Sequence, residues 1–285
     1  MDGIILIDKQ KEYTSHDVVA IVKRLSKAKV GHTGTLDPIA TGVLPLLIGN
    51  ATKISKYLIN HDKTYIAELK LGIKTDTADS EGKIVEERKV PEFTEEQVKS
   101  VLNSIIGRQK QVPPMYSAIK VNGRKLYEYA RKGQSVEIAS RMIEIYNAKL
   151  IEFDKSNNIV KFELKCSKGT YVRTVCEEIA EKLGTVGFMK ELRRIQVGEF
   201  NIEKAVTIDE LRKNEELLFK NLISIEEVFK NKEKITLNDK QLGLFLNGVM
   251  LTEEKDDGIY LIYNKEKFIG LGIIKNNLLK RDVII

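Results

Sequence analysis

The sequence predicts an α+β fold in which a large domain, built on a mixed and mainly antiparallel sheet, precedes a small β-rich domain. Strand and helix patterns follow one another over most of the chain without the regular alternation of a doubly wound fold. A polar stretch, KNKEK at 230–234, then leads into short strand-like runs divided by Gly and Asp-Asp turns. The length of 285 residues fits two domains at about 150 residues each. We therefore expect domains at 1–230 and 235–285.

The first elements are a strand and a helix. Residues 3–7, GIILI, form an unbroken apolar run that is typical of a buried strand. Ser15 is then expected to cap a helix, because Val18, Val22 and Leu25 recur at helical spacing. The chain thus opens with strand, loop and helix.

A second helix is expected after Thr94, which has capping-box spacing to Gln97, and Gly107 is expected to stop it. Apolar and polar residues alternate over 64–71, which predicts a strand with one buried face. Further expected elements are strands at 139–153, 159–166, 259–263 and 268–274, a turn at Asn122-Gly123 and a helix within 170–183.

The composition, 42% hydrophobic and 31% charged, is that of an ordinary soluble globular protein. The longest weakly polar run, 43–48, is far shorter than the roughly 20 apolar residues of a spanning helix. The N-terminus has neither the positive region nor the cleavage site of a signal peptide. We expect a cytoplasmic protein with no membrane contact. Cys166 and Cys176 fit neither a disulfide framework nor a metal-ligand spacing, so no metal site is expected.

The net charge is +6, from 47 Lys and Arg against 41 Asp and Glu. The segment 108–132 concentrates seven of these cations against one acid, Glu128. Two interpretations remain open: the segment is a footprint for a polyanion such as nucleic acid, or it is a solvated lysine-rich surface.

The most unusual segment is 31–49, GHTGTLDPIATGVLPLLIG, where Gly, Pro and Thr surround one carboxylate, Asp37. The pattern of a phosphate-binding P-loop is absent, since no lysine follows Gly34 or Gly42. An aspartate before a proline is commonly a turn former, so a purely structural role for Asp37 stays open.

Three other candidates have structural alternatives as well. Tyr65 lies on the apolar face of its strand and fits a core tyrosine. Arg173 has Glu177 four residues later, which suits a surface ion pair on a helix. His32 fits a buried polar residue.

Several segments together resemble the TruB family of tRNA pseudouridine synthases. They occur in the family's order and cover most of residues 1–200: GHTGTLDPIATGVLPLLIG (31–49), KTYIAELKLGIKTDTADSEGKI (63–84), QVPPMYSAIKVNGRKLYEYARKG (111–133), KGTYVRT (168–174) and LRRIQVGEF (192–200).

The resemblance implies a catalytic domain of the pseudouridine synthase type followed by a small PUA-like RNA-binding domain. It implies that the protein isomerises uridine to pseudouridine at position 55, in the T loop of tRNAs. The implied partner is the tRNA T stem-loop, and neither a metal nor an organic cofactor is implied. We also expect a monomer without an obligate protein partner.

Residue by residue, the resemblance places the family's catalytic aspartate at Asp37. Tyr65 falls on the tyrosine that stacks on the target base, and Arg173 on the arginine that pairs with the aspartate. His32 matches a histidine that helps to hold the flipped base. The implied substrate-binding set is His32, Tyr65, Arg173, Lys9 and Tyr171.

The N-terminal motif departs from the family's usual D-K-P-x-G-x-T-S. Residues 8–15 read DKQKEYTS, with Gln10 in place of proline and Glu12 in place of glycine. The charged and hydroxyl positions of the motif remain, so we expect an effect on the rigidity of this loop and none on the reaction.

The implied reaction suits these residue types. The target nucleotide must leave its stack, which costs a few kcal/mol that stacking and hydrogen bonds in a pocket offset. A carboxylate such as Asp37 then acts as a nucleophile at C1′ or C6, or as a base at C2′. Arg173 is expected to keep that carboxylate ionised by lowering its pKa.

Two alternatives to a stand-alone synthase are carried forward. An enzyme of the dyskerin type shares the loop motifs but depends on a guide RNA and protein partners; the chain lacks the long basic extensions that would favour it. A noncatalytic RNA-binding or RNA-folding protein could retain the same fold, although Asp37, Tyr65 and Arg173 are all present.

Overall fold

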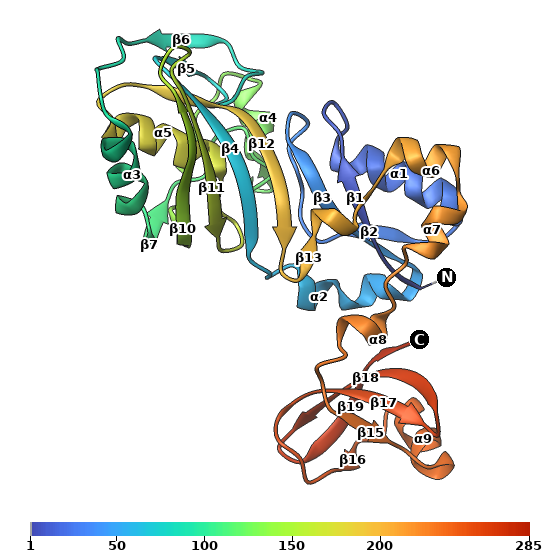
Figure 1. Cartoon of the computed structure of the whole chain (residues 1–285). Coiled ribbons are helices and arrows are strands. Elements are labelled where there is room, and N and C mark those ends of the chain that lie inside the picture. Colours follow the sequence, from blue (N-terminus) through green and yellow to red (C-terminus); the bar gives the residue numbers. More distant parts are fainter. Residues whose placement is uncertain (1) are drawn as a thin grey trace.

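The computed structural model describes residues 2–285 and is built on two main sheets, a large one and a smaller one in the C-terminal part (Figure 1). The larger sheet has ten strands, in the order β14-β1-β3-β12-β4-β11-β10-β7, with β2 added on β3 and β13 on β12. Its strands are β1 (Gly3–Lys9), β2 (Val30–His32), β3 (Thr41–Ile48), β4 (Lys63–Leu71), β7 (Gly107–Gln111), β10 (Arg141–Asp154), β11 (Ile159–Cys166), β12 (Gly187–Val197), β13 (Phe200–Asn201) and β14 (Val206–Thr207).

The strand pairing confirms the predicted fold class. Within the large sheet only β1 with β14 and β3 with β12 pair in parallel, and the other pairings are antiparallel. The parallel contact of β3 with β12 is short, joining Thr41 to Arg193 and Gly42 to Arg194. This contact lies directly after the glycine- and threonine-rich loop that precedes β3. It therefore fixes the point at which the chain enters the sheet after that loop.

Most helices flank the large sheet, whereas the last one (Asp239–Leu246) packs against the C-terminal sheet, and two short ribbons extend from the large domain. The helices are α1 (Ser15–Ser26), α2 (Ser55–Leu58), α3 (Glu95–Ser104), α4 (Leu126–Ala130), α5 (Val172–Lys182), α6 (Ile208–Lys213), α7 (Glu216–Lys220), α8 (Ile225–Val228) and α9 (Asp239–Leu246), with 3-10 turns at Gly49–Ile54 and Ile202–Lys204. The ribbons pair β5 (Ile73–Thr75) with β6 (Ile84–Glu87) and β8 (Lys120–Val121) with β9 (Arg124–Lys125). No helix within residues 2–285 is long and apolar enough to cross a membrane.

Local signals account for most of these elements. Thr94 and Gln97 form the predicted capping box of α3. The predicted cap of α1 was wrong by one residue, because Thr14 caps this helix in a capping box with Asp17. Ser15 is the first helical residue, and its hydroxyl bonds outside the helix.

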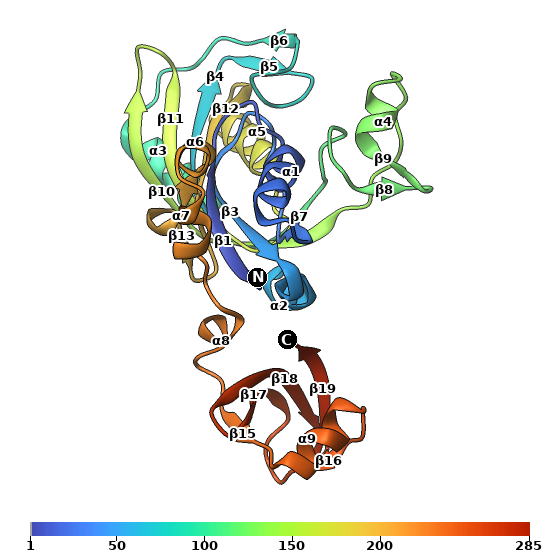
Figure 2. The ribbon, with the colours of Figure 1, turned by 90° about the vertical axis from the view of Figure 1, so that its right-hand side faces the viewer.

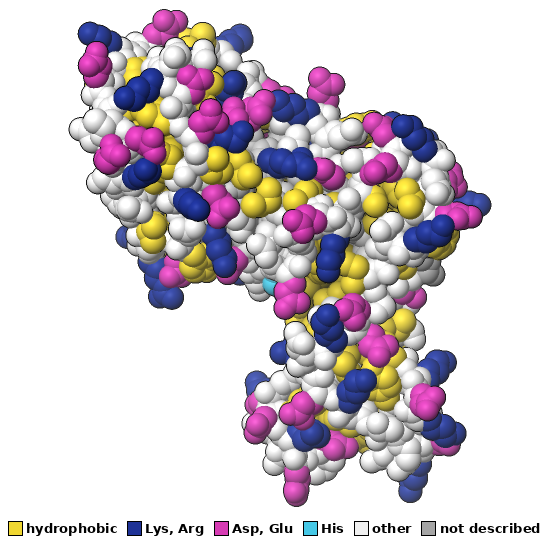
Figure 3. Space-filling model, viewed as in Figure 1, with side chains coloured by type: hydrophobic (Ala, Val, Ile, Leu, Met, Phe, Trp, Pro, Cys, Tyr) yellow, Lys and Arg dark blue, Asp and Glu magenta, His cyan; other side chains and the backbone are white. Residues whose placement is uncertain are grey.

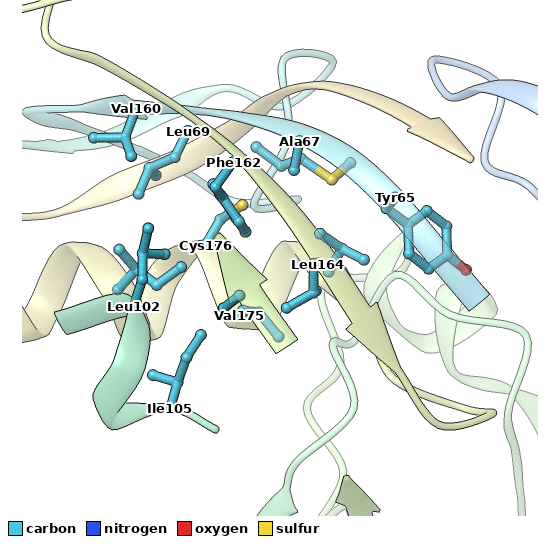
Figure 4. Close-up of a cluster of buried hydrophobic side chains, with 14 of the residues drawn as sticks. Tyr65, Ala67, Leu69, Leu102, Ile105, Val160, Phe162, Leu164, Val175 and Cys176 are labelled. Carbon is cyan, nitrogen blue, oxygen red and sulfur yellow. The ribbon is translucent and has the colours of Figure 1, made fainter. Parts of the chain in front are cut away.

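The alternating pattern of β4 places one face of this strand in the main hydrophobic core. Ala67 and Leu69 are fully buried there against α3 and α5, together with Phe162 of β11 and Cys176 of α5 (Figure 4). The cysteine is thus a core residue, as its helical spacing predicts.

A second sheet forms the C-terminal part, in the order β15-β17-β18-β19-β16. Its strands are β15 (Lys234–Thr236), β16 (Leu251–Thr252), β17 (Gly258–Asn264), β18 (Lys267–Lys275) and β19 (Leu278–Ile284). The polar stretch at 230–234 connects α8 to this sheet, and its last residue, Lys234, begins β15. Figure 2 shows the sheet below the body, opposite the end that carries β5 and β6.

The C-terminal sheet has its own core and also shares one. Phe245, Ile262 and Leu279 pack together within it. Leu261 and Val283 instead belong to a cluster that includes residues of the large domain near α2 and α8. Lys56 and Tyr57 bond to Asp282 across the same contact. The two parts therefore meet through apolar packing as well as polar bonds.

Candidate active site

A cavity of about 580 Å³ brings together segments that are far apart in the sequence. It is lined by the 33–37 loop, the beginnings of β4 and β10, the 167–173 segment and parts of β12. Of the expected site residues, those that line it are Asp37, Tyr65, Tyr171 and Arg173. Lys9 and His32 are not among its lining residues.

The loop that carries Asp37 is fixed by the helix before it. Because Thr14 caps α1, the Ser15 hydroxyl is free to accept a hydrogen bond from the Leu36 N–H at 2.9 Å. The same hydroxyl donates to the Leu36 carbonyl oxygen at 3.2 Å. Both polar groups of the residue before Asp37 are thereby tied to α1.

Lys9 holds the other side of the loop. Its side chain is fully buried, and the ammonium donates to the carbonyl oxygens of Gln10 at 3.0 Å, Tyr13 at 2.7 Å and Pro38 at 3.1 Å. Burial lowers the pKa of Lys9 to about 8. All three hydrogens of the ammonium are used in these bonds, so Lys9 positions the residue after Asp37 and has no donor left for a substrate.

Glu12 shows how the chain tolerates its departure from the family motif. Its φ is 72°, in the left-handed region that favours glycine, and its N–H donates to the Pro38 carbonyl oxygen at 3.1 Å. The turn therefore keeps the conformation that a glycine would adopt, at a cost in backbone strain. Gln10 donates to Asp209 at 3.3 Å, a contact that the usual proline could not make.

Arg173 connects three segments of the cavity. It is 4% exposed, and its Nη2 lies 3.1 Å from Oδ2 of Asp37 and donates to the Tyr116 carbonyl oxygen at 2.9 Å. Its Nη1 donates to the Thr77 carbonyl oxygen at 3.1 Å and lies 3.5 Å from Oδ2 of Asp79. The guanidinium thus contacts Asp37 through one carboxylate oxygen, Oδ2. The alternative pairing with Glu177 is wrong, because that carboxylate contacts Lys74 at 3.3 Å.

The direction of the pKa shift of Asp37 is opposite to the expectation. Burial raises the pKa of the Asp37 carboxyl, and the negative charge of Asp79 acts in the same direction. Arg173 pulls the pKa down, as expected, but does not outweigh the burial. The Asp37 side chain remains 37% exposed, toward the cavity that it lines. Asp37 is therefore a more basic carboxylate than an ordinary surface aspartate.

Arg194 of β12 anchors the loop that carries Asp37 from within the sheet. It is 1% exposed, and its guanidinium donates to the carbonyl oxygens of Val43 at 2.8 Å, Gly34 at 3.1 Å and Thr35 at 3.3 Å. Its backbone passes so close to Gly42 that a Cβ there would lie 2.1 Å from the Arg194 carbonyl oxygen. The glycine is required by this approach, and Arg194 holds both ends of the loop.

Two aromatic rings contribute to the walls. Tyr65 is 8% exposed and lies at the end of the main core, with its oxygen directed away from Ala67 and Leu164 (Figure 4). Burial raises the pKa of Tyr65 to about 12, so the hydroxyl stays protonated. Tyr171 precedes α5, and the Arg141 guanidinium lies over its ring, 4.6 Å from the ring centre.

His32 lies at the start of the loop. Its ring packs edge-on against His16 with the ring centres 5.7 Å apart, and burial lowers the pKa of His32. Its Nδ1 is buried without a hydrogen-bond partner in the described residues. The structure thus places a neutral imidazole beside the loop and leaves it outside the cavity wall.

Four cavity residues carry a buried polar atom that lacks a partner within residues 2–285. These atoms are Oγ1 of Thr33, Oγ of Ser117, Nε of Arg141 and Nε of Arg173. Buried polar atoms are costly when unpaired, so their concentration here points to a polar ligand that completes their bonding. Within the same residues, no group of His, Cys, Asp and Glu side chains has the arrangement of a metal site.

Sequence reasoning missed two residues that shape the site. Asp79 lies in the TDTADSEG segment of the resemblance, and Arg194 lies in LRRIQVGEF. Both are charged and buried; Asp79 contacts Arg173, and Arg194 donates to a carbonyl oxygen of the loop. The motif letters mark these positions as unusual, but only the fold shows which partners they meet.

Comparison with known proteins identifies the family. The description "TruB family pseudouridylate synthase (N terminal domain)" matches residues 22–172, and "tRNA pseudouridylate synthase B C-terminal domain" matches residues 173–230. The chain belongs to the TruB family of pseudouridylate synthases. A relative named tRNA pseudouridine synthase B, from Clostridium tetani, is 43% identical and is matched over 95% of each chain. One from Francisella tularensis subsp. novicida is 39% identical over 100% of this chain and 97% of its own.

Solved structures agree on the fold of this TruB family member. A chain of an H/ACA RNP bound to a substrate RNA has a TM-score of 0.71 at 22% identity, covering 99% of this chain and 85% of that chain. A chain of a Cbf5-Nop10-Gar1 complex gives the same TM-score at 23% identity, covering 99% and 83%.

Proposed function

We propose that this TruB family isomerase converts uridine 55 in the T loop of tRNA to pseudouridine, with Asp37 acting on the substrate. The observation that supports this most strongly is the position of Asp37. It is the only acidic residue among those lining the described cavity, it lies 3.1 Å from the buried Arg173, and Tyr65 lines the same cavity. A single activated carboxylate in an otherwise cationic and aromatic pocket suits one covalent or proton-transfer step on a nucleobase nucleotide.

The cavity suits a flipped uridine. A T-loop base must leave its stack to enter, and Tyr65 offers an aromatic face on which stacking recovers about 1 to 3 kcal/mol. The hydroxyls of Thr33 and Ser117 lack partners and can bond to the oxygen atoms and N–H groups of uracil. These contacts hold the base and leave the Asp37 carboxylate available for the reaction.

The Asp37 carboxylate is arranged to react through one oxygen. Arg173 holds Oδ2 at 3.1 Å, and no hydrogen bond from residues 2–285 reaches Oδ1. Oδ1 is therefore free to attack C1′ or C6, or to remove the C2′ proton. The raised pKa of Asp37 makes the carboxylate a stronger nucleophile and base, while Arg173 still favours its ionised form.

After the N1–C1′ bond breaks, the uracil must turn in place before C5 joins C1′. Leu36, Val172, Met189 and Leu192 supply an apolar wall that retains the base and limits water. All atoms of the substrate are conserved in the product, so the reaction needs no co-reactant.

Two outlying parts are proposed as RNA-contacting surfaces. The first is the ribbon β8–β9 with α4, which carries Lys120, Arg124 and Lys125 and lies apart from the large sheet in Figure 2. On the face of Figure 3, cations and acids are instead interspersed over the surface. The second is the C-terminal segment 235–285, as a PUA-like module. Because Leu261 and Val283 share a core cluster with the large domain, substitution of exposed lysines tests this module better than truncation.

The proposal includes a monomer that acts in the cytoplasm without a guide RNA or protein partner. Purified protein alone is incubated with an unmodified tRNA transcript, and pseudouridine is mapped by carbodiimide adduct formation and primer extension. We expect one modified uridine, at position 55. Modification only after addition of a guide RNA or partner proteins would favour a dyskerin-type enzyme, and no modification with intact tRNA binding would favour an RNA-binding role.

A further inference from the structure

One wall of the cavity carries more positive charge than the uracil ring requires. Five cations line the cavity, namely Lys63, Arg141, Lys168, Arg173 and Arg194, against the single carboxylate of Asp37. Arg173 is engaged by Asp37, and Arg194 by carbonyl oxygens of the loop. The other three have no anionic partner within residues 2–285.

Lys63 is a buried cation with a spare donor. It is 7% exposed, and its ammonium donates to the carbonyl oxygens of Ile59 and His61, which leaves one hydrogen unused. Burial, together with the positive charges of Arg194 and Lys168, lowers the pKa of Lys63 to about 8. A buried ammonium with cationic neighbours is stabilised when an anion approaches it.

Arg141 and Lys168 complete the cationic wall. The Arg141 guanidinium is held over the Tyr171 ring, and its buried Nε has no partner in the described residues. Gly169 brings the backbone close, since a Cβ there would lie 3.5 Å from Nη1 of Arg141. Among the described residues, Lys168 donates only to the neutral side chain of Asn60, at 2.5 Å.

No ion pair within residues 2–285 neutralises Lys63, Arg141 or Lys168. The carboxylate next to Lys63 in sequence, Asp62, accepts a hydrogen bond from Tyr146 at 3.2 Å and does not line the cavity. The N-terminus of α5 opens on the same wall and lacks a side-chain cap, which adds the positive end of a helix dipole.

We propose that Lys63, Arg141 and Lys168 form a subsite for a phosphodiester that flanks the target uridine in the RNA strand. The inference rests on the proposed function, because that function brings an RNA nucleotide into the cavity. The uracil ring is neutral, and in the proposed function its partners are Asp37, Tyr65 and the hydroxyls of Thr33 and Ser117. The phosphate attached to the same nucleotide is the group that the unpaired cations match, and such contacts fix the position of a strand without reading its sequence.

The test combines neutral RNA linkages with a lysine substitution. T stem-loops are made with a single methylphosphonate at each linkage around the target uridine, and their affinities for wild type and for Lys168→Met are compared. Lys168 is exposed, so its substitution does not threaten folding. We expect one or two flanking linkages whose neutralisation weakens binding to the wild type about 3- to 10-fold and weakens binding to Lys168→Met clearly less, because this variant has lost one of the three cations that face the phosphate. Equal sensitivity of the two proteins at every flanking linkage would overturn the subsite.

Two further variants sharpen the test. Lys155→Met is the matched control, because Lys155 follows the end of β10 opposite to Arg141, about 40 Å along the strand. It should keep the wild-type response at every linkage. Lys168→Met should also reduce the slope of log affinity against log salt by about 0.7 to 0.9. An unchanged slope would count against the phosphate contact.

Pseudouridine formation by the wild type on the unsubstituted stem-loop separates the two claims. If the wild type modifies this RNA but Lys168→Met responds like the wild type to every neutral linkage, the subsite is wrong and the proposed function stands. If the wild type forms no pseudouridine, the proposed function fails. Competition by inorganic phosphate, equal for RNAs with and without the neutral linkage, would mean that the wall binds free phosphate and not the strand.

Discussion

Nη2 of Arg173 lies 3.1 Å from Oδ2 of Asp37 and donates to the Tyr116 carbonyl oxygen from the same nitrogen. The guanidinium therefore fixes the carboxylate relative to the cavity wall as well as supplying charge. This geometry requires a planar group with several donors in fixed directions.

Arg173→Lys is expected to lower kcat by about two orders of magnitude with little change in KM, because an ammonium keeps the charge but cannot span Asp37, Tyr116 and Thr77 together. Single-turnover kinetics on tRNA measure the effect. Glu177→Gln, on the same helix, is the matched control and should react at the wild-type rate, since Glu177 contacts Lys74. Similar losses in both variants would show that α5 had been disturbed as a whole.

The pH profile should report the raised pKa of Asp37. The reaction needs the ionised carboxylate, so kcat/KM falls as the pH drops through a pKa that lies above the ordinary aspartate value. Asp79→Asn removes a negative charge that raises this pKa, and the acid limb should therefore move to lower pH. Profiles from about pH 4 to 8, each normalised to its own plateau, test the sign. A shift to higher pH contradicts the electrostatic role of Asp79.

Tyr65→Phe and Tyr65→Leu separate the ring from the hydroxyl. If the ring acts by stacking on the base, the phenylalanine variant keeps substrate capture and the leucine variant weakens it by about 1 to 3 kcal/mol. Fluorescence titration with a T stem-loop gives the affinities, and circular dichroism checks the core that Tyr65 adjoins. Equal wild-type affinities and rates in both variants would return Tyr65 to a core role.

Glu12→Gly should stabilise the protein. Glu12 has a φ of 72°, which costs a non-glycine residue about 1 to 2 kcal/mol of stability. Glycine removes this strain but destabilises the folded state by about 0.5 to 1 kcal/mol, because its unfolded chain has more conformational entropy to lose. We expect thermal unfolding to shift upward by about 1 to 2 °C. Glu12→Ala retains the Cβ and should not gain. A lower midpoint for the glycine variant contradicts the strain at this position.

The sequence carried much of the fold because its signals are local. The alternation in β4 and the Thr94 capping box depend on neighbours within a few residues, and both appear in the structure. The cap of α1 was misplaced by one residue because a long-range contact, which local signals do not show, decides it. Ser15 and Thr14 are both good caps, and only the distant Leu36 backbone decides that Ser15 is used elsewhere.

The site was less accessible to sequence reasoning because its contacts are long-range. Asp79 and Arg194 stood in quoted motifs, yet nothing in their spacing shows that one contacts Arg173 and the other the carbonyl of Gly34. The reverse holds for Lys9. The motif marks its position, but the structure gives all its donors to backbone carbonyls. The two interpretations of Tyr65, as a core residue and as a site residue, are compatible, because Tyr65 belongs to the core cluster and also lines the cavity.

The most direct test of the account is the rate of pseudouridine formation at position 55 of an unmodified tRNA transcript by wild type and Asp37→Asn. Burial raises the pKa of Asp37, so ionisation of the carboxyl opposes folding at neutral pH, and the neutral amide should leave the protein at least as stable as the wild type. We predict that Asp37→Asn binds tRNA within about threefold of the wild type and loses at least about three orders of magnitude in rate, because an amide is neither nucleophile nor base. A folded Asp37→Asn protein that forms pseudouridine near the wild-type rate would contradict the central claim.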